Sequence, residues 1–232
     1  MNKFSTLFCT LSFTFLNSVL AIAETPSHGI LALLGVNDTS SYDNLLSSFE
    51  EKAQSMNCAI LREGPVVAED GDIDLDQPNR FIYFDCETSL LGSSNGRDFL
   101  TDLGKGTDYI AAMEGTPFFQ DSASFKRNAG ERSYILKVSH YNNSNPKKRD
   151  LDFAHLGETV QPRADAYQLE SFVGTTRAYG MPTPDEAVVL YYDNAAAGDR
   201  FRDNNPDVLN KVVDFNDKHL TDYIYYFAQS RR

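Results

Sequence analysis

The stretch Ile82-Tyr83-Phe84-Asp85 recurs as Leu190-Tyr191-Tyr192-Asp193, displaced by 108 positions. Leu61 and Leu169, which lie in two shorter apolar runs, are displaced by the same interval. Short runs rich in β-branched and aromatic residues are typical of β-strands. Two strand pairs in one register therefore predict a chain built from two related halves.

The first half is predicted to follow the order strand, helix, strand, strand, helix, strand. Apolar residues recur at helical spacing between Tyr42 and Met56, after an apolar run at 29–35. The other expected elements are strands at 58–61 and 80–84, a helix at 97–103 and a strand at 107–112. A long polar loop, 69–79, is expected between the two middle strands.

The second half is predicted to repeat this order. Its strands are expected at 134–138, 166–169, 187–192 and 221–226, and its helices at 151–160 and 206–218. The tetrapeptide Thr-Asp-Tyr-Ile occurs at 107 and again at 221, which indicates a six-residue insertion near the second helix of the later half. The predicted domains are a first unit at 24–113, a linker at 114–131 and a second unit at 132–232.

The N-terminus has the features of a secretory signal peptide at 1–23. One basic residue, Lys3, precedes an uncharged stretch from Phe4 to Leu20, and Ala21-Ile22-Ala23 forms a small-residue cleavage site. The alternative is a membrane anchor, but the apolar part falls short of the roughly 20 residues that a span needs. We therefore expect a secreted or periplasmic protein without integral membrane association.

The composition indicates a folded acidic protein. The 232 residues include 33 Asp and Glu against 21 Lys and Arg, for a formal net charge of -12, and 41% are hydrophobic. The apolar fraction is near the globular average. Binding to nucleic acid needs clustered basic residues, and the basic run Lys147-Lys148-Arg149 is short. We therefore expect no nucleic-acid partner.

The predicted order, βαββαβ twice, is that of the ferredoxin-like motif. The second half resembles the dimeric α+β barrel superfamily in four stretches: Asp165–Leu169, Glu186–Asp193, Ala195-Ala196-Ala197 and Asn205–Leu209. The resemblance implies an α+β protein in which two tandem ferredoxin-like units join their sheets into one barrel. It also allows a homo-oligomer. Members include monooxygenases, isomerases, cyclases and haem-binding enzymes, so the fold leaves the function open.

The ferredoxin-like motif also implies a pairing of two cysteines. Its second and third strands form an antiparallel hairpin, and a hairpin centred near position 72 places Cys58 opposite Cys86, within reach of a disulfide. Signal cleavage removes Cys9 and leaves this pair in an oxidising compartment. The alternative is two buried thiols.

Motifs for metal ions and for nucleophilic catalysis are weak or absent from the sequence. Asp70, Asp72, Asp74 and Asp76 alternate as at the start of a calcium loop. The glycine and the glutamate that such a loop has at its sixth and twelfth positions are missing. A solvated hairpin edge is the favoured interpretation, and no metal site is expected. The sequence contains no nucleophile elbow, phosphate loop or paired zinc-binding histidines.

Four residues of the second half are candidates for ligand binding: His140, Tyr167, Tyr191 and His219. The two histidines flank strands that are neighbours in the ferredoxin-like fold, and tyrosine suits the wall of a small-molecule pocket. The alternative is that the tyrosines simply fill a half-buried sheet. No cofactor is expected, although His155 would be a haem ligand if it faced a cleft.

These features predict an exported protein that binds a small molecule of unknown identity between the sheet and helices of the second unit. Two alternatives remain open from the sequence. One is an enzyme of the same superfamily, either a cofactor-independent monooxygenase, isomerase or cyclase, or a haem-dependent enzyme. The other is a structural or interaction module whose barrel is filled by side chains.

Overall fold

The computed structural model describes residues 27–73, 75, 77–120 and 132–231. In them, eight strands close into a barrel in the order β1-β3-β2-β8-β5-β7-β6-β4, and neighbouring strands are antiparallel. The predicted signal peptide, 1–23, lies outside the described residues. None of the helices in the described part is long and apolar enough to span a bilayer.

The elements of the two units follow the predicted order, except that the second unit contains one additional helix, α5. The first unit contains β1 (His28–Gly35), α2 (Thr39–Ser55), β2 (Cys58–Gly71), β3 (Arg80–Cys86), α3 (Ser94–Gly104) and β4 (Tyr109–Gln120). The second unit contains β5 (Ser133–Tyr141), α4 (Pro146–Val160), β6 (Gln168–Tyr179), β7 (Glu186–Tyr192), α5 (Ala195–Asn204), α6 (Pro206–His219) and β8 (Leu220–Gln229).

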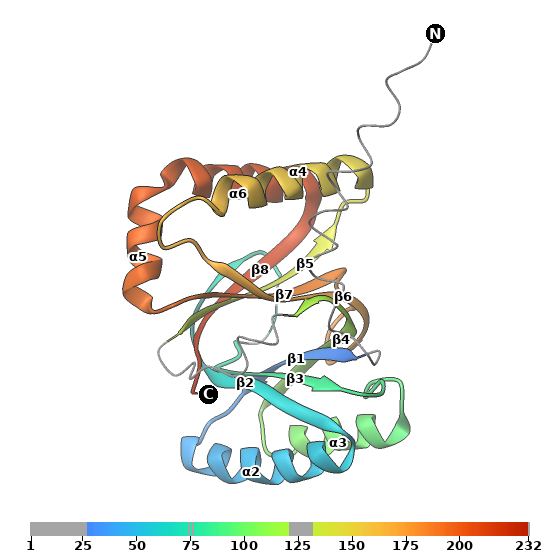
Figure 1. Ribbon diagram of the computed structural model, residues 1–232. Helices are drawn as coiled ribbons and strands as arrows, with labels where there is room; N and C mark the ends of the chain where they lie inside the picture. Colours follow the sequence, from blue (N-terminus) through green and yellow to red (C-terminus); the bar gives the residue numbers. More distant parts are fainter. Residues whose placement is uncertain (1–26, 74, 76, 121–131, 232) are drawn as a thin grey trace.

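Each unit forms a four-stranded ferredoxin-like sheet, with the orders β4-β1-β3-β2 and β8-β5-β7-β6. The sheets join where β2 pairs with β8 and where β4 pairs with β6. Helices α2 and α3 cover the first sheet on one side of the barrel, and α4, α5 and α6 lie on the opposite side (Figure 1). The α+β class and the single-chain dimeric α+β barrel fold are thus confirmed.

Strand alternation divides the apolar side chains between the barrel interior and the two helical layers. Tyr191 packs inside the barrel, whereas Tyr192 packs against Phe201 of α5, so the two tyrosines face opposite sides of the sheet. Tyr83 lies inside the barrel like Tyr191, and Phe84 lies under the helices like Tyr192. The displacement of 108 therefore relates structurally equivalent positions.

The displacement of 114 taken from the repeated tetrapeptide does not relate equivalent positions. Ile110 pairs with Leu34 and lies in the core under α2 and α3, whereas Ile224 pairs with Val138 inside the barrel. A shift of one residue exchanges the two faces of a strand, so the tetrapeptide match is out of register. The second unit does have two helices, α5 and α6, where the first has α3.

Most strands extend beyond their predicted ends, and two of the extensions in the first unit change its expected boundaries. Strand β2 continues to Gly71, into the expected loop, and β4 continues to Gln120, past the unit boundary expected at Met113. The outer parts of both strands pair with the other unit, through β8 and β6. Residues 121–131, the rest of the expected linker, lie outside the described residues.

The disulfide predicted from the hairpin is present. Cys58 and Cys86 are directly paired across β2 and β3, and their sulfur atoms are bonded. Both side chains are buried in the core between the sheet and the helices of the first unit. The bond fixes the first residue of β2 to the last residue of β3.

Candidate functional site

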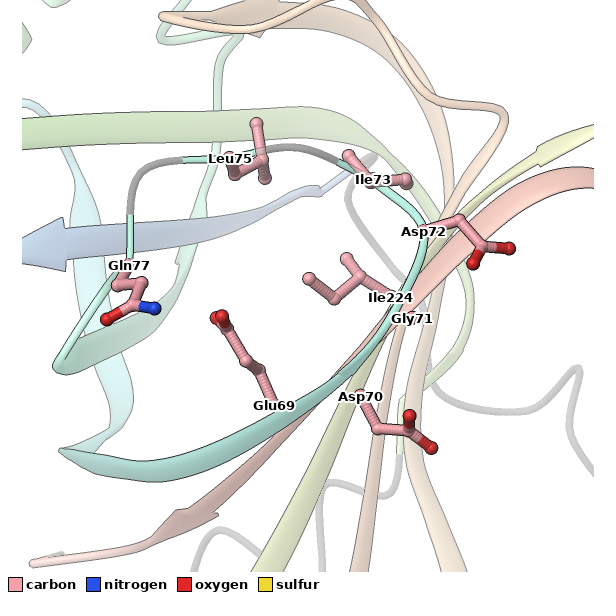
Figure 2. A pocket seen from close by; sticks show the side chains of 8 residues that line it. All are labelled: Glu69, Asp70, Gly71, Asp72, Ile73, Leu75, Gln77 and Ile224. Carbon is pink, nitrogen blue, oxygen red and sulfur yellow. The ribbon is translucent and has the colours of Figure 1, made fainter.

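A cavity of about 620 Å³ opens at one mouth of the barrel, where the end of β2 leads into the segment before β3. Figure 2 shows this segment curving around the cavity. Its lining comes from the end of β2, from the β2–β3 connection and from one residue of β8: Glu69, Asp70, Gly71, Asp72, Ile73, Leu75, Gln77 and Ile224.

Gly71 allows the close backbone approach that closes this end of the barrel. Its φ is 149°, a conformation that side chains other than glycine rarely adopt, and it pairs directly with Ile224. A Cβ atom at this position would lie 2.3 Å from the carbonyl oxygen of Tyr223. The amide of Asp72 then donates a hydrogen bond of 2.7 Å to the same oxygen, which holds the start of the loop against β8.

The walls of the cavity differ in polarity. Ile73, Leu75 and Ile224 form an apolar wall that continues into the barrel core. The side chains of Glu69 and Gln77 point into the same space (Figure 2). Within the described residues, the carboxylate of Glu69 has no hydrogen-bond or ion-pair partner, and none of the eight lining residues is Lys, Arg or His. The arrangement therefore combines three apolar side chains with the carboxylate of an exposed residue, Glu69, that points into the cavity.

Tyr226 lies one step deeper in the barrel. It is the cross-strand partner of Glu69 and shares its face of the sheet, two residues along β8 from Ile224. The side chain is fully buried, and its hydroxyl has no hydrogen-bond partner among the described residues. Burial raises the pKa of Tyr226, and Tyr109 and Glu69 add to the shift, so the hydroxyl stays protonated.

The alternating aspartates do not converge as calcium ligands do in the described residues. The carboxylates of Asp70 and Asp72 point away from Glu69 (Figure 2). In the part of the chain that the structure describes, no group of three or more His, Cys, Asp or Glu side chains could hold a metal ion. Asp74 and Asp76 lie outside the described residues.

The two histidines predicted to bind a ligand each contact a separate carboxylate. His140, at the end of β5, lies with Nδ1 2.5 Å from Oδ1 of Asp222. His219 is buried at the end of α6, with Nε2 2.8 Å from Oδ2 of Asp152 in α4. Strands β5 and β8 are neighbours as expected, but these side chains have different partners.

The two predicted tyrosines lie on opposite faces of the second sheet. Tyr167 is half-buried beside α5, with its ring 5.6 Å from that of Phe201. Tyr191 lies in the barrel, where the Arg132 guanidinium is 4.0 Å from the centre of its ring. None of the four predicted residues lines the cavity at the mouth. Their role in ligand binding stays a prediction, which titration of the variants His140→Gln and Tyr191→Phe would test.

A buried polar cluster, missed in the sequence, lies between the second sheet and its helices. Lys137 and Ser139 each donate a hydrogen bond of 2.6 Å to Oε1 of Glu186, and Tyr141 donates to the other carboxylate oxygen. Burial alone would raise the pKa of Glu186, but Lys137 and the two hydroxyls lower it below its usual value. The only sequence signal is the polar alternation of Lys137 and Ser139 in an otherwise apolar strand.

The histidines do not fit the haem that the resemblance allows. His155 is exposed on α4 rather than directed into a cleft. His28 lies 3.4 Å from a carboxylate oxygen of Glu114, and His140 and His219 contact aspartates as described. Between α4, α6 and the sheet, the rings of Phe153, Phe172 and Phe215 are in contact. No histidine nitrogen is therefore presented to a haem-sized space among the described residues.

No protein-family model matches the sequence, and no curated protein matches it. Solved structures do share its fold. An anthrone oxidase-like protein is 13% identical, with a TM-score of 0.56, over 90% of this chain and 94% of the other. A candidate monooxygenase from Lactobacillus acidophilus is 14% identical, with a TM-score of 0.51, over 90% of this chain and 95% of the other.

A mutant chlorite dismutase from Candidatus Nitrospira defluvii, in complex with cyanide, is 10% identical. Its TM-score is 0.56, over 90% of this chain and 92% of the other. Identities this low define a shared fold and leave the chemistry of the site to be argued from this chain's own residues. The protein is thus a tandem dimeric α+β barrel with a cavity at one mouth.

Proposed function

We propose that the protein is an exported binding protein that holds a small molecule in the cavity at the mouth of the barrel. The observation that carries the proposal is the cavity itself, about 620 Å³ in volume, with an apolar wall opposite one inward carboxylate. Small-molecule sites typically have volumes of roughly 300–1,000 Å³, and the volume of this cavity lies within that range. The signal-like N-terminus and the disulfide support export.

The lining favours binding over catalysis. Among the described residues, the lining contains no His, Cys, Ser, Lys or Tyr side chain, so its only titratable groups are carboxylates. The monooxygenase and chlorite dismutase names belong to structural neighbours at 14% identity or less. An enzymatic function would therefore rest on the fold alone.

A tryptophan can test the location of binding, because the natural sequence contains none. Gln77→Trp places an indole in the cavity from an exposed position, without disturbing the core. Val67→Trp is the matched control, because Val67 is 61% exposed on β2 and does not line the cavity. A library of small organic molecules would be screened against the exported protein by ligand-observed NMR.

We expect some molecules to bind the wild-type protein and the Val67→Trp variant but not the Gln77→Trp variant. Binding that is equal in all three proteins would place the ligand elsewhere and contradict the proposal. Intact mass of the exported protein would test export, with Glu24 expected as the first residue.

A further inference from the structure

We infer that the ligand of this cavity is a small organic cation, an amine or quaternary ammonium with an apolar body, whose charge pairs with Glu69. The inference rests on the proposed function, because it concerns the same cavity. It adds the chemical class of the ligand.

The charge of the cavity selects a cation. Glu69 points inward without a partner among the described residues, and the lining includes Asp70 and Asp72 at its rim but no basic side chain. The protein as a whole carries a formal charge of -12, which raises the local concentration of cations. An anionic ligand would instead meet a carboxylate with no compensating charge.

The shape of the site selects an organic cation over a metal ion. A calcium ion needs six to eight converging oxygen ligands, whereas Asp70 and Asp72 point away from Glu69 (Figure 2). The wall facing Glu69 is formed by Ile73, Leu75 and Ile224, which suit a hydrocarbon chain.

Two further polar groups can complete the recognition of an ammonium head. An ammonium group has up to three N–H donors and no acceptor. The side chain of Gln77 faces the same space as Glu69, and its carbonyl oxygen can accept a hydrogen bond. The hydroxyl of Tyr226 does not line the cavity, but it is buried, has no partner among the described residues and lies on the same face of the sheet as Glu69, so it offers another acceptor to a ligand that reaches past the lining.

The experiment compares four probes of equal chain length: hexylamine, hexyltrimethylammonium, hexanol and hexanoate. Each is titrated into the exported, full-length mature protein by calorimetry at low salt. The test variant is Glu69→Gln, which keeps the shape of the side chain. The matched control is Glu51→Gln, because it removes the same charge from an exposed residue of α2 that does not line the cavity.

We expect both cationic probes to bind at least about tenfold more tightly than hexanol, and hexanoate to bind more weakly than hexanol. Glu69→Gln should lower the affinity for hexylamine about tenfold or more and abolish its advantage over hexanol. Glu51→Gln should keep that advantage. Added salt should weaken the binding of the cations more than that of hexanol.

Two outcomes would overturn the inference. If hexanol binds as tightly as hexylamine, and only Gln77→Trp abolishes both, then the ligand class is wrong while binding in the cavity stands. If calcium chloride binds in a Glu69-dependent manner and displaces hexylamine, the site takes a metal ion instead. The proposed function fails separately, when a broad set of molecules shows no binding sensitive to Gln77→Trp.

Discussion

Removing the disulfide should destabilise the protein by a measurable amount. Cys58 and Cys86 are separated by 28 positions, and the bond restricts the unfolded chain over that loop. The chain-entropy relation gives roughly 3.6 kcal/mol for a loop of this length at room temperature, within the usual range of about 2–4 kcal/mol. Alanine is the appropriate replacement, because both side chains are buried in an apolar core where serine would leave an unpaired hydroxyl.

The assay is equilibrium unfolding in urea, monitored by circular dichroism, of the wild type, both single variants and the double alanine variant. Each single variant breaks the same bond, so all three should lose a similar free energy of unfolding rather than additive amounts. The urea m-value should rise, because the unfolded chain without the cross-link exposes more surface.

Alkylation supplies the chemical control. Intact mass of the exported wild type should show no added alkyl group without reductant and two after reduction. A double variant whose free energy of unfolding lies within about 1 kcal/mol of the wild type would refute the loop-closure reasoning, since the expected loss is several times larger.

Three other predictions concern the strand seam and the buried ion pair. Gly71→Ala should lower the free energy of unfolding by more than about 1 kcal/mol, because Gly71 has a positive φ and no room for a Cβ atom. Gly157→Ala in α4, where a Cβ atom meets nothing within 4 Å, should raise the free energy of unfolding by up to about 1 kcal/mol. Thermal unfolding measures both changes. Lys137→Met should cost about 3–5 kcal/mol in urea unfolding, because it leaves the buried carboxylate of Glu186 uncompensated. The pKa of Glu186 is lowered in the folded protein, so its carboxylate contributes fully to the free energy of unfolding above a pH of about 4.5, its usual pKa. That contribution is lost as the pH falls through the lower pKa of the folded state. Below a pH of about 4.5, the stability of the wild type should therefore fall more steeply than that of Glu186→Gln.

The order of elements could be predicted because each unit carries local patterns that need no knowledge of the partner. The equivalence of Tyr83 and Tyr191 came from a displacement shared by two strand pairs, and both residues lie inside the barrel. The hairpin register placed Cys58 opposite Cys86 for the same reason: the centre of one connection fixes the pairing of both strands. The repeated tetrapeptide lacked such support from its neighbours, and its register is wrong.

The ends of β2 and β4 could not be predicted from one unit. Glu69, Asp70 and Gly71 are polar and exposed, which is typical of a loop, and they are strand residues because β8 of the other unit supplies their hydrogen-bond partners. The candidate histidines show the same limit. The imidazole chemistry of His140 and His219 is visible in the sequence, but their partners Asp222 and Asp152 become neighbours only on folding.

The cavity belongs to the junction of the units rather than to either unit. Glu69 comes from the first unit and Ile224 from the second, and the direct pairing of β2 with β8 brings them together. Comparing the two halves with each other directs attention to residues that one half has and the other lacks, as it did for His140 and His219. A site formed where the halves meet has no counterpart in such a comparison. In a tandem barrel, the segments that extend past the repeat and pair with the other unit are therefore the places to search for a ligand, and here they hold the inward carboxylate of Glu69.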